Sequence, residues 1–516
     1  MSASAASQGS RGRLGLGGAP ADAGAGGAQP AQGSCASADS PPEPGRAARA
    51  VTVLVCCSTM FMIAVDTTVV NLALPLIGRG LHAQVAGLQW TIAAYTICTA
   101  SLMLTSGSIG DRFGRRPVLL AGLAAFTAAS AGCGLAPGIG WLIAFRALQG
   151  AAGSALTPMA MGIITATFAD PAARARVLGI WSGTFGVGMA TGPVAGGLLA
   201  AAWGWRSLFW INIVPGLAAI TAAAVVIPDS RASRPRRLDV RGQVLVITFL
   251  ACLCYGIIEG PAAGWRSAPV LAAFTVAGSA LALLAGWERR AVSPLLDPRV
   301  FRSVPFSGAL VITVATFACL GGFLFLTTLY LQDVRGLTAL RAGLALLPLA
   351  VATAVAGPLA GRVLARHGGR WTLAVAGWAL AAGCFTLAQS SASAPWVLLA
   401  AAYALFGAGY GAVNTVIAAV AVAGLHRDQA GVAGGITSAG RQAGQSLGVS
   451  VTGSVLALGL HGAIRGDFAA ASHPAWVLLA ECGLAVALLG LTTTARRPPA
   501  AAGPRPGRAR PPRPRS

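Results

Sequence analysis

The chain contains no lysine and few charged residues of any kind. Its 37 basic residues are all arginine, and charged residues make up only 10% of its 516 positions. A Walker-type phosphate-binding loop needs a lysine to contact the nucleotide phosphates, so the sequence argues against an ATP-driven pump within this chain. No zinc motif and no nucleophile–base pairing is found either. We therefore expect no catalytic residues, no metal site and no enzyme activity.

The cysteines also lack the pattern of a metal site. Ten are present, nine inside apolar runs and Cys35 in the amino-terminal tail. The pair Cys252/Cys254 has neither the spacing nor the partner ligands of a metal-binding motif. We interpret the nine as small apolar residues.

Apolar sequence is abundant. Apolar residues make up 55% of the chain, and apolar runs of about 20 residues, enough to cross a bilayer as a helix, recur along it. This pattern predicts an all-α polytopic membrane protein. The tails 1–50 and 495–516 are predicted to be disordered, because their composition cannot form a core. Fourteen runs can be delimited: 51–77, 88–107, 117–136, 140–160, 176–200, 207–227, 242–260, 268–287, 306–330, 342–362, 371–389, 395–421, 431–458 and 475–494.

The arginines fall in alternate connections. The two tails and the even-numbered connections hold 29, and the odd-numbered connections hold six. Because positive loops stay in the cytoplasm, both termini are predicted to be cytoplasmic, which requires an even number of spans. The net charge of +22 then reflects orientation in the membrane, and we expect no nucleic-acid partner. The six are Arg79, Arg206, Arg266, Arg335, Arg341 and Arg465.

Asp66 lies inside the first apolar run. A carboxylate near the middle of a bilayer costs about 2.5–3.5 kcal/mol on insertion scales, so a chain that retains one there is expected to use it. The use would be to bind a proton, an ion or a cationic substrate. The alternative is an acid that lies in a water-filled vestibule or caps a neighbouring helix.

The connection 107–116 is a compact acidic and basic loop that reads Gly-Ser-Ile-Gly-Asp-Arg-Phe-Gly-Arg-Arg. It resembles the loop 2–3 signature of the major facilitator superfamily, with Ile109 where leucine is usual. The resemblance implies a gating role for the loop rather than substrate contact. The residues concerned are Gly107, Asp111, Arg112, Gly114, Arg115 and Arg116.

Three further strings extend this resemblance. Residues 142–150 match the helix 4 signature, and 66–75 match the helix 1 signature of the fourteen-helix drug:proton antiporter branch. The string 188–197 is similar to the helix 5 signature of proton-driven antiporters, and its glycines share one helical face beside a proline. These are Gly188, Gly192, Pro193, Gly196 and Gly197. The carboxyl half matches less well: its copy of the loop signature, 357–370, lacks the aspartate.

The resemblance implies two six-helix bundles around a central cavity, with two additional helices between them. The expected divisions are 51–227 for the first bundle, 228–305 for the linker helices with their loops, and 306–494 for the second bundle. The protein is expected to work as a monomer in the cell membrane.

The family role implied for Arg146 in helix 4 is proton coupling, with Asp66 as the proton carrier. The alternative is a structural pair that joins helices 1 and 4. Asn71, Gln149, Arg441 and Gln442 are candidates for substrate contact or for the same hydrogen-bond network. Whether Glu259 or Glu481 takes part is open.

The resulting hypothesis is a proton-coupled exporter of small lipophilic or cationic compounds that works by alternating access. It needs no cofactor, because the proton gradient supplies the energy. Two alternatives remain: an uptake symporter for a small metabolite, and a transporter-like sensor without flux. The sequence cannot name the substrate.

Overall fold

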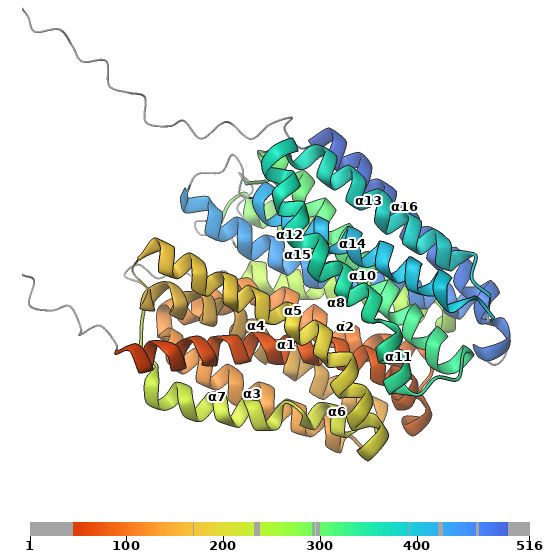
Figure 1. The fold of residues 1–516 in the computed structure, drawn as a ribbon, viewed down its shortest axis with the longest axis horizontal. Coiled ribbons are helices and arrows are strands. Elements are labelled where there is room, and N and C mark those ends of the chain that lie inside the picture. The colour runs from red at the N-terminus through yellow and green to blue at the C-terminus, as the bar shows by residue number, and fades with distance from the viewer. Residues whose placement is uncertain are drawn as a thin grey trace, which may run out of the picture. The chain divides into compact units, whose positions relative to one another are not determined.

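The protein is described by a computed structural model (Figure 1). It covers residues 45–168, 170–231, 238–291, 295, 300–391, 393–421, 427–460 and 464–493, with only the backbone for 418, 427–432 and 464–466. The carboxyl-terminal tail and nearly all of the amino-terminal tail, whose disorder was predicted, lie outside the described residues.

The first part of the chain forms seven helical segments. The predicted run 207–227 is divided in two by a break at Ile211 and Asn212. The first helix begins at Arg46, five residues inside the segment predicted to be disordered. The segments are α1 (Arg46–Leu81), α2 (Val85–Phe113), α3 (Arg115–Leu135), α4 (Ile139–Thr167), α5 (Pro171–Trp203), α6 (Ser207–Trp210) and α7 (Ile213–Val226).

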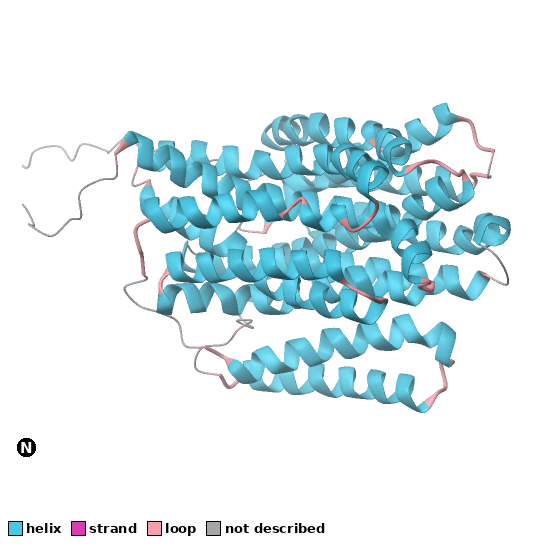
Figure 2. Ribbon diagram, turned by 90° about the horizontal axis from the view of Figure 1, so that it is seen from below, coloured by secondary structure: helices cyan, strands magenta, loops and turns pink. Residues whose placement is uncertain are grey.

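The rest of the chain is also helical where it is described (Figure 2). The tenth predicted run divides into α11 and α12, and the ninth extends into a π-helical turn, η2. The segments are α8 (Val240–Ala263), α9 (Ala268–Glu288), the 3₁₀ turn η1 (Val300–Arg302), α10 (Val304–Leu329), η2 (Tyr330–Val334), α11 (Ala339–Ala345), α12 (Leu347–His367), α13 (Gly369–Ala388), α14 (Trp396–Val420), α15 (Arg427–Gly459) and α16 (Ile464–Thr493).

All fourteen predicted runs are helical. Within the described residues, thirteen helical stretches are long and apolar enough to cross a membrane. The fourteenth is α15, which has 33 residues but is rich in glycine, serine and threonine. Such a composition suits a helix that packs closely against other helices instead of facing lipid. The chain is therefore an all-α, multi-pass membrane protein.

The packing of the first half is repeated in the second. In the first half α1 packs on α5 and α2 on α4, and in the second half α10 packs on α15 and α12 on α14. The halves meet where α2 contacts α15, α5 contacts α11 and α1 contacts α10. The additional helix α8 packs on both α2 and α15, and so bridges the two halves at one side.

The same kind of hydrogen bond occurs once in each half and identifies equivalent positions. The Thr99 hydroxyl of α2 donates to the Gly150 carbonyl of α4 over 3.0 Å. The Thr353 hydroxyl of α12 donates to the Gly407 carbonyl of α14 over the same distance. At both glycines an added Cβ would collide with the backbone of the neighbouring helix, so α4 occupies the place in one half that α14 occupies in the other.

The two ends of the helices differ in charge. We call the end that carries Arg46 and the connections 111–116 and 362–370 the arginine-rich end, and the opposite end the arginine-poor end. In Figure 1, α1 starts at the arginine-rich end on the left and runs to the right.

Candidate functional site

Asp66 of α1 and Arg146 of α4 form a buried ion pair. Arg146 Nη1 lies 2.7 Å from Asp66 Oδ2, and the two side chains are 2% and 1% exposed. Both charges are therefore removed from solvent. Removing one member of such a pair leaves the other buried and uncompensated.

Two amides complete the surroundings of the carboxylate. Gln149 Nε2 donates to Asp66 Oδ1 over 3.0 Å, and Asn212 Nδ2 donates to the same oxygen over 3.2 Å. Both amides also lie within hydrogen-bond distance of Ser130 Oγ, which donates to the Phe209 carbonyl. The carboxylate therefore accepts hydrogen bonds from three donors, Arg146, Gln149 and Asn212.

Arg146 is held in place by further contacts on other sides of its guanidinium. Nη1 also donates to Gln149 Oε1 over 2.8 Å, and Nε donates to the Thr91 carbonyl over 3.2 Å. The guanidinium carbon lies 4.3 Å from the centre of the Tyr95 ring, within the range of a cation–π contact. The Asp66 network thus joins α1, α2, α3, α4 and the break between α6 and α7.

Sequence reasoning missed Asn212 and Ser130. Asn212 reaches Asp66 because the chain leaves the helix at Ile211, so its side chain projects into the bundle at the break. The available signal was the one amide side chain inside an apolar run that also contains Pro215.

Asn71 does not contact Asp66. Its amide donates to the Thr67 carbonyl, and its buried Oδ1 has no hydrogen-bond partner among the described residues. Five residues along a helix correspond to a rotation of about 500°, so the two side chains project on different sides of α1. Asn71 and Thr68 line a pocket instead.

That pocket lies between the two halves. Its first-half side is formed by α1 and α5, and its second-half side by α10 and α12. No charged side chain is among its lining residues in the described part of the chain. They are Thr68, Asn71, Leu72, Met189, Pro193, Leu324, Thr328, Leu346, Leu349 and Ala350. We call it the central pocket.

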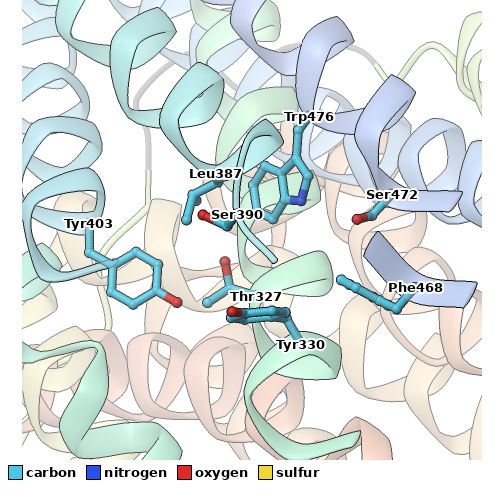
Figure 3. A pocket seen from close by; sticks show the side chains of 8 residues that line it. All are labelled: Thr327, Tyr330, Leu387, Ser390, Tyr403, Phe468, Ser472 and Trp476. Carbon is cyan, nitrogen blue, oxygen red and sulfur yellow. The ribbon is translucent and has the colours of Figure 1, made fainter. Parts of the chain in front are cut away.

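The second half carries an uncharged cluster where the first half carries the ion pair. Arg146 lies four residues before Gly150, and Tyr403 lies four residues before the equivalent Gly407. The ring centre of Tyr403 is 5.7 Å from that of Phe323 in α10. Tyr403 also lines a pocket within the second half, where its hydroxyl points inward (Figure 3).

The glycines of α5 bring two helices close to it. Gly188, Gly192 and Gly196 lie against α1: a Cβ at Gly188 would be 2.7 Å from the Ala64 Cβ, and one at Gly192 would overlap Thr68 Oγ1. Gly197 and Pro193 face the other half, where they contact the backbone of α11. The string 188–197 therefore contacts both the Asp66 helix and the second half.

The loop 107–116 is held by the first half of the chain. Asp111 pairs with Arg115 over 3.2 Å, and Arg115 Nη1 donates to the Gly162 carbonyl over 3.0 Å. Arg116 donates to the Ala224 carbonyl at the end of α7. The resemblance to the superfamily implies a further partner for Asp111 at the amino-terminal end of α15, near Gln429–Gly431, where side chains are not described.

Three residues of this loop need separate description. Gly114 has φ +105°, which favours glycine, and an added Cβ would meet the Asp229 carboxylate. The Arg112 guanidinium lies 5.7 Å from the Phe113 ring centre. Gly107 has open space on its Cβ side.

At the arginine-poor end, polar contacts join the two halves. Arg79 of α1 pairs with Asp333 of η2 over 2.6 Å, and Gln332 Nε2 donates to the Leu72 carbonyl over 2.7 Å. Gln89 of α2 donates to the Ser450 carbonyl of α15 over 2.7 Å. We call these contacts the outer latch.

The remaining candidates lie outside the Asp66 network. Glu259 of α8 accepts a hydrogen bond from Trp90 Nε1 over 2.9 Å, which ties α8 to α2. Glu481 is exposed on α16. Arg441 and Gln442 are partly buried on α15, in the second half.

A multi-pass helical protein with repeated halves, a buried ion pair in the first half and a pocket between the halves has the architecture of a secondary transporter that works by alternating access. The family model described as Major Facilitator Superfamily matches residues 56–449. The chain belongs to this superfamily.

The curated relatives are resistance proteins. The chain is 37% identical over 408 residues to the "Tetracenomycin C resistance and export protein" of Streptomyces glaucescens, covering 79% of this chain and 76% of the relative. It is 35% identical over 434 residues to the "Methylenomycin A resistance protein" of Streptomyces coelicolor, covering 84% and 89%.

Solved structures confirm the fold. A bacterial homologue of the human lysosomal transporter Spinster, described as inward-facing and unoccupied, aligns with a TM-score of 0.59 at 16% identity. The alignment covers 87% of this chain and 95% of that one.

Proposed function

We propose that this protein exports small lipophilic molecules from the cytoplasm in exchange for protons. Membership of the superfamily and the names of the resistance and export relatives support this function. The observation that carries it is the buried Asp66–Arg146 pair, because a membrane-embedded carboxylate with a dedicated partner is suited to bind a proton. The proton gradient supplies the energy, no cofactor takes part, and transport, not catalysis, is the activity.

Protonation of Asp66 would loosen the network that joins the helices of the first half. The carboxylate accepts hydrogen bonds from Arg146, Gln149 and Asn212. A neutral carboxyl group loses its Coulomb attraction to Arg146, and one of its oxygens becomes a donor. The contacts of α1 with α4 and with the α6–α7 break therefore weaken when the proton binds. This change supplies the two states that alternating access requires.

The proton and the substrate occupy different sides of α1 in this account. Asp66 lies inside the first half, whereas Thr68 and Asn71 line the central pocket. Coupling is then indirect: substrate in the pocket and proton on Asp66 favour different positions of the same helix. Because Gly192 of α5 lies against Thr68, α5 moves with α1.

The arrangement of contacts supports an inward-facing state. By the distribution of arginine, the arginine-rich end and both termini are cytoplasmic, and the protein lies in the cell membrane. The outer latch closes the opposite end. The residues that line the pocket at Tyr403 are uncharged, which supports a coupling charge in the first half, and we propose that the protein works as a monomer.

The test is transport by everted membrane vesicles energised with a proton gradient. The test panel is tetracenomycin C and methylenomycin A, the compounds that the relatives' names give. Export predicts uptake into everted vesicles that collapses with the gradient, together with substrate-induced proton efflux. Symport would give proton movement in the same direction as the substrate.

A matched pair of variants separates transport from sensing. Asp66→Asn should reach the membrane, fold and lose uptake into everted vesicles, whereas Glu481→Gln, at an exposed position, should retain it. A sensor would show no flux in the wild type and altered signalling in the first variant.

A further inference from the structure

Arg441 is a second arginine within the membrane span, and its surroundings differ from those of Arg146. It lies near the middle of α15, with its guanidinium carbon 5.4 Å from the centre of the Phe317 ring of α10. Phe317 in turn makes an edge contact with Tyr410 of α14, with ring centres 5.6 Å apart. Three helices of the second half therefore meet at this guanidinium.

Within the described residues, Arg441 has no acidic partner and no hydrogen bond. The four ion pairs found there involve Asp66, Asp111, Asp229 and Asp333 with other arginines. The Nε atom of Arg441 is buried and unpartnered. A cation at this depth is costly to retain without an anion, which makes the site incomplete as it stands.

Two further polar atoms, both on α14, are buried and unpartnered among the described residues. Tyr410, which is 2% exposed, has no hydrogen-bond partner for its hydroxyl among the described residues. Asn414, one turn further along α14, has none for its Oδ1. Tyr410 and Arg441 can both donate, so they can bind the same acceptor.

The face of α15 that carries Arg441 opens toward the arginine-rich end. Gly434, Ser438, Arg441 and Gln445 recur at intervals of three or four residues and so share one face. The first is exposed with open space on its Cβ side, the next two are partly buried, and Gln445 is buried. Arg441 thus lies between the exposed part of this face, at Gly434, and its buried part, at Gln445.

The other faces of α15 are occupied by neighbouring helices. Gly435 lies against Leu104 of α2, Gly440 lies against Leu310 of α10, and Ser446 lies against Cys254 of α8. The face with Arg441 is therefore the one left for the space between the two halves. That space is the substrate path in the proposed function.

We infer that Arg441 binds an acidic group of the transported molecule, and that the substrates are lipophilic organic anions such as carboxylates. The inference rests on the proposed function and specifies its substrate class. The guanidinium and the Tyr410 hydroxyl hold the acidic group, while the Phe317 ring contacts the apolar body. Arg441 would repel an organic cation. Asp66 would not attract one either, because its charge is already neutralised by Arg146.

An anionic substrate also suits the energetics of exchange. An anion leaving the cell and a proton entering it both move charge in the direction that an inside-negative potential drives. Transport of such a substrate is therefore electrogenic and responds to the membrane potential as well as to the pH gradient.

The experiment measures equilibrium binding to the purified full-length protein in nanodiscs, without any gradient. Three probes share one ring system and differ in charge: naphthoate, naphthylmethanol and naphthylmethylammonium. The wild type should bind naphthoate more tightly than the other two, and Arg441→Gln should weaken naphthoate binding roughly tenfold or more, the effect of losing one charged hydrogen bond. Arg441→Lys should restore part of the preference.

Controls distinguish this site from other sources of anion binding. Arg366→Gln removes an exposed arginine of α12 and should leave the preference for naphthoate unchanged. Nanodiscs with and without phosphatidylglycerol test a lipid headgroup as the occupant. If phosphatidylglycerol competes with naphthoate only when Arg441 is present, the site is a lipid site and the inference is wrong.

The remaining outcomes also decide the matter. Four results would each overturn the inference that Arg441 binds an acidic group of the substrate. They are equal binding of the three probes, preference for the cation, absence of naphthoate binding to the wild type, and unchanged naphthoate binding in Arg441→Gln. Because the assay uses no gradient, failure of the proposed function appears separately, as absence of proton-driven flux in the wild type.

Discussion

Replacing Arg146 and Asp66 singly and together measures how strongly the two residues are coupled. Arg146→Gln leaves Asp66 buried with two amide donors, Gln149 and Asn212, and without its counter-charge. Removing one partner of a buried pair costs about 3–5 kcal/mol. Because the two amides remain, we expect the low end, ~3 kcal/mol in the free energy of unfolding.

The double variant should recover most of this loss. With Asn at position 66 and Gln at position 146, no charge is buried and the amides can still hydrogen-bond. A deficit of ~1 kcal/mol relative to the wild type is expected, because neutral partners replace charged ones imperfectly. The coupling energy of the double-mutant cycle is then ~2 kcal/mol or more.

The assay is chemical unfolding in mixed micelles, followed by far-ultraviolet circular dichroism. Arg366→Gln, at an exposed position, is the control and should change stability by less than ~0.5 kcal/mol. A coupling energy within ~0.5 kcal/mol of zero would refute the reasoning that the pair is a stabilising interaction between α1 and α4. All three variants should lack proton-driven uptake into everted vesicles even where stability is recovered.

Four further predictions concern the moving parts and the topology. Gly192→Leu should insert normally but lose transport, because its side chain would overlap Thr68 on α1; normal uptake by everted vesicles would show that this contact is not needed. Asp333→Asn breaks the outer latch at Arg79 and should increase cysteine labelling at the arginine-poor end by no more than about fivefold, since one partly exposed ion pair contributes less than ~1 kcal/mol. Asp111→Ala should shift the population inward and slow turnover; unchanged cysteine accessibility at both faces would contradict this. A reporter fused after Trp265 should lie outside the cell and one after Arg302 in the cytoplasm, and a cytoplasmic signal after Trp265 would reduce the span count to twelve.

The helices could be predicted from the sequence because apolar length alone determines which segments cross a bilayer. The helix α15 is the instructive case: its glycines and hydroxyls make it less apolar than the other spans, yet the run 431–458 can still be delimited, and the arginine-bearing connections support it as a span. The break at Ile211 and Asn212 was not predicted, since it interrupts a run that is apolar on both sides.

The site was predictable in part. Asp66 and Arg146 stand out because a charge inside an apolar run is costly. Two opposite charges that both lie inside such runs are therefore expected to form a pair. Asn212 and Ser130 are neutral, cost little, and lie 146 and 64 residues from Asp66 in the chain, so nothing local links them to it. The position of Asn71 on a different side of α1 follows from helical geometry and could have been derived.

The environment of Arg441 could not be derived from its own helix. Its face on α15 follows from periodicity, but the absence of an acidic partner among the described residues depends on which side chains three other helices bring near it. The same limit applies to the glycines of α5, whose contacts with α1 and α11 depend on tertiary packing.

Proton release from the purified protein in detergent, induced by a compound of the test panel, tests the central claim that Asp66 carries the driving proton. We expect the wild type and the variants Glu259→Gln and Glu481→Gln to release protons when the compound binds, and Asp66→Asn to release none. If Asp66→Asn releases as many protons as the wild type, the carrier lies elsewhere and the account is contradicted.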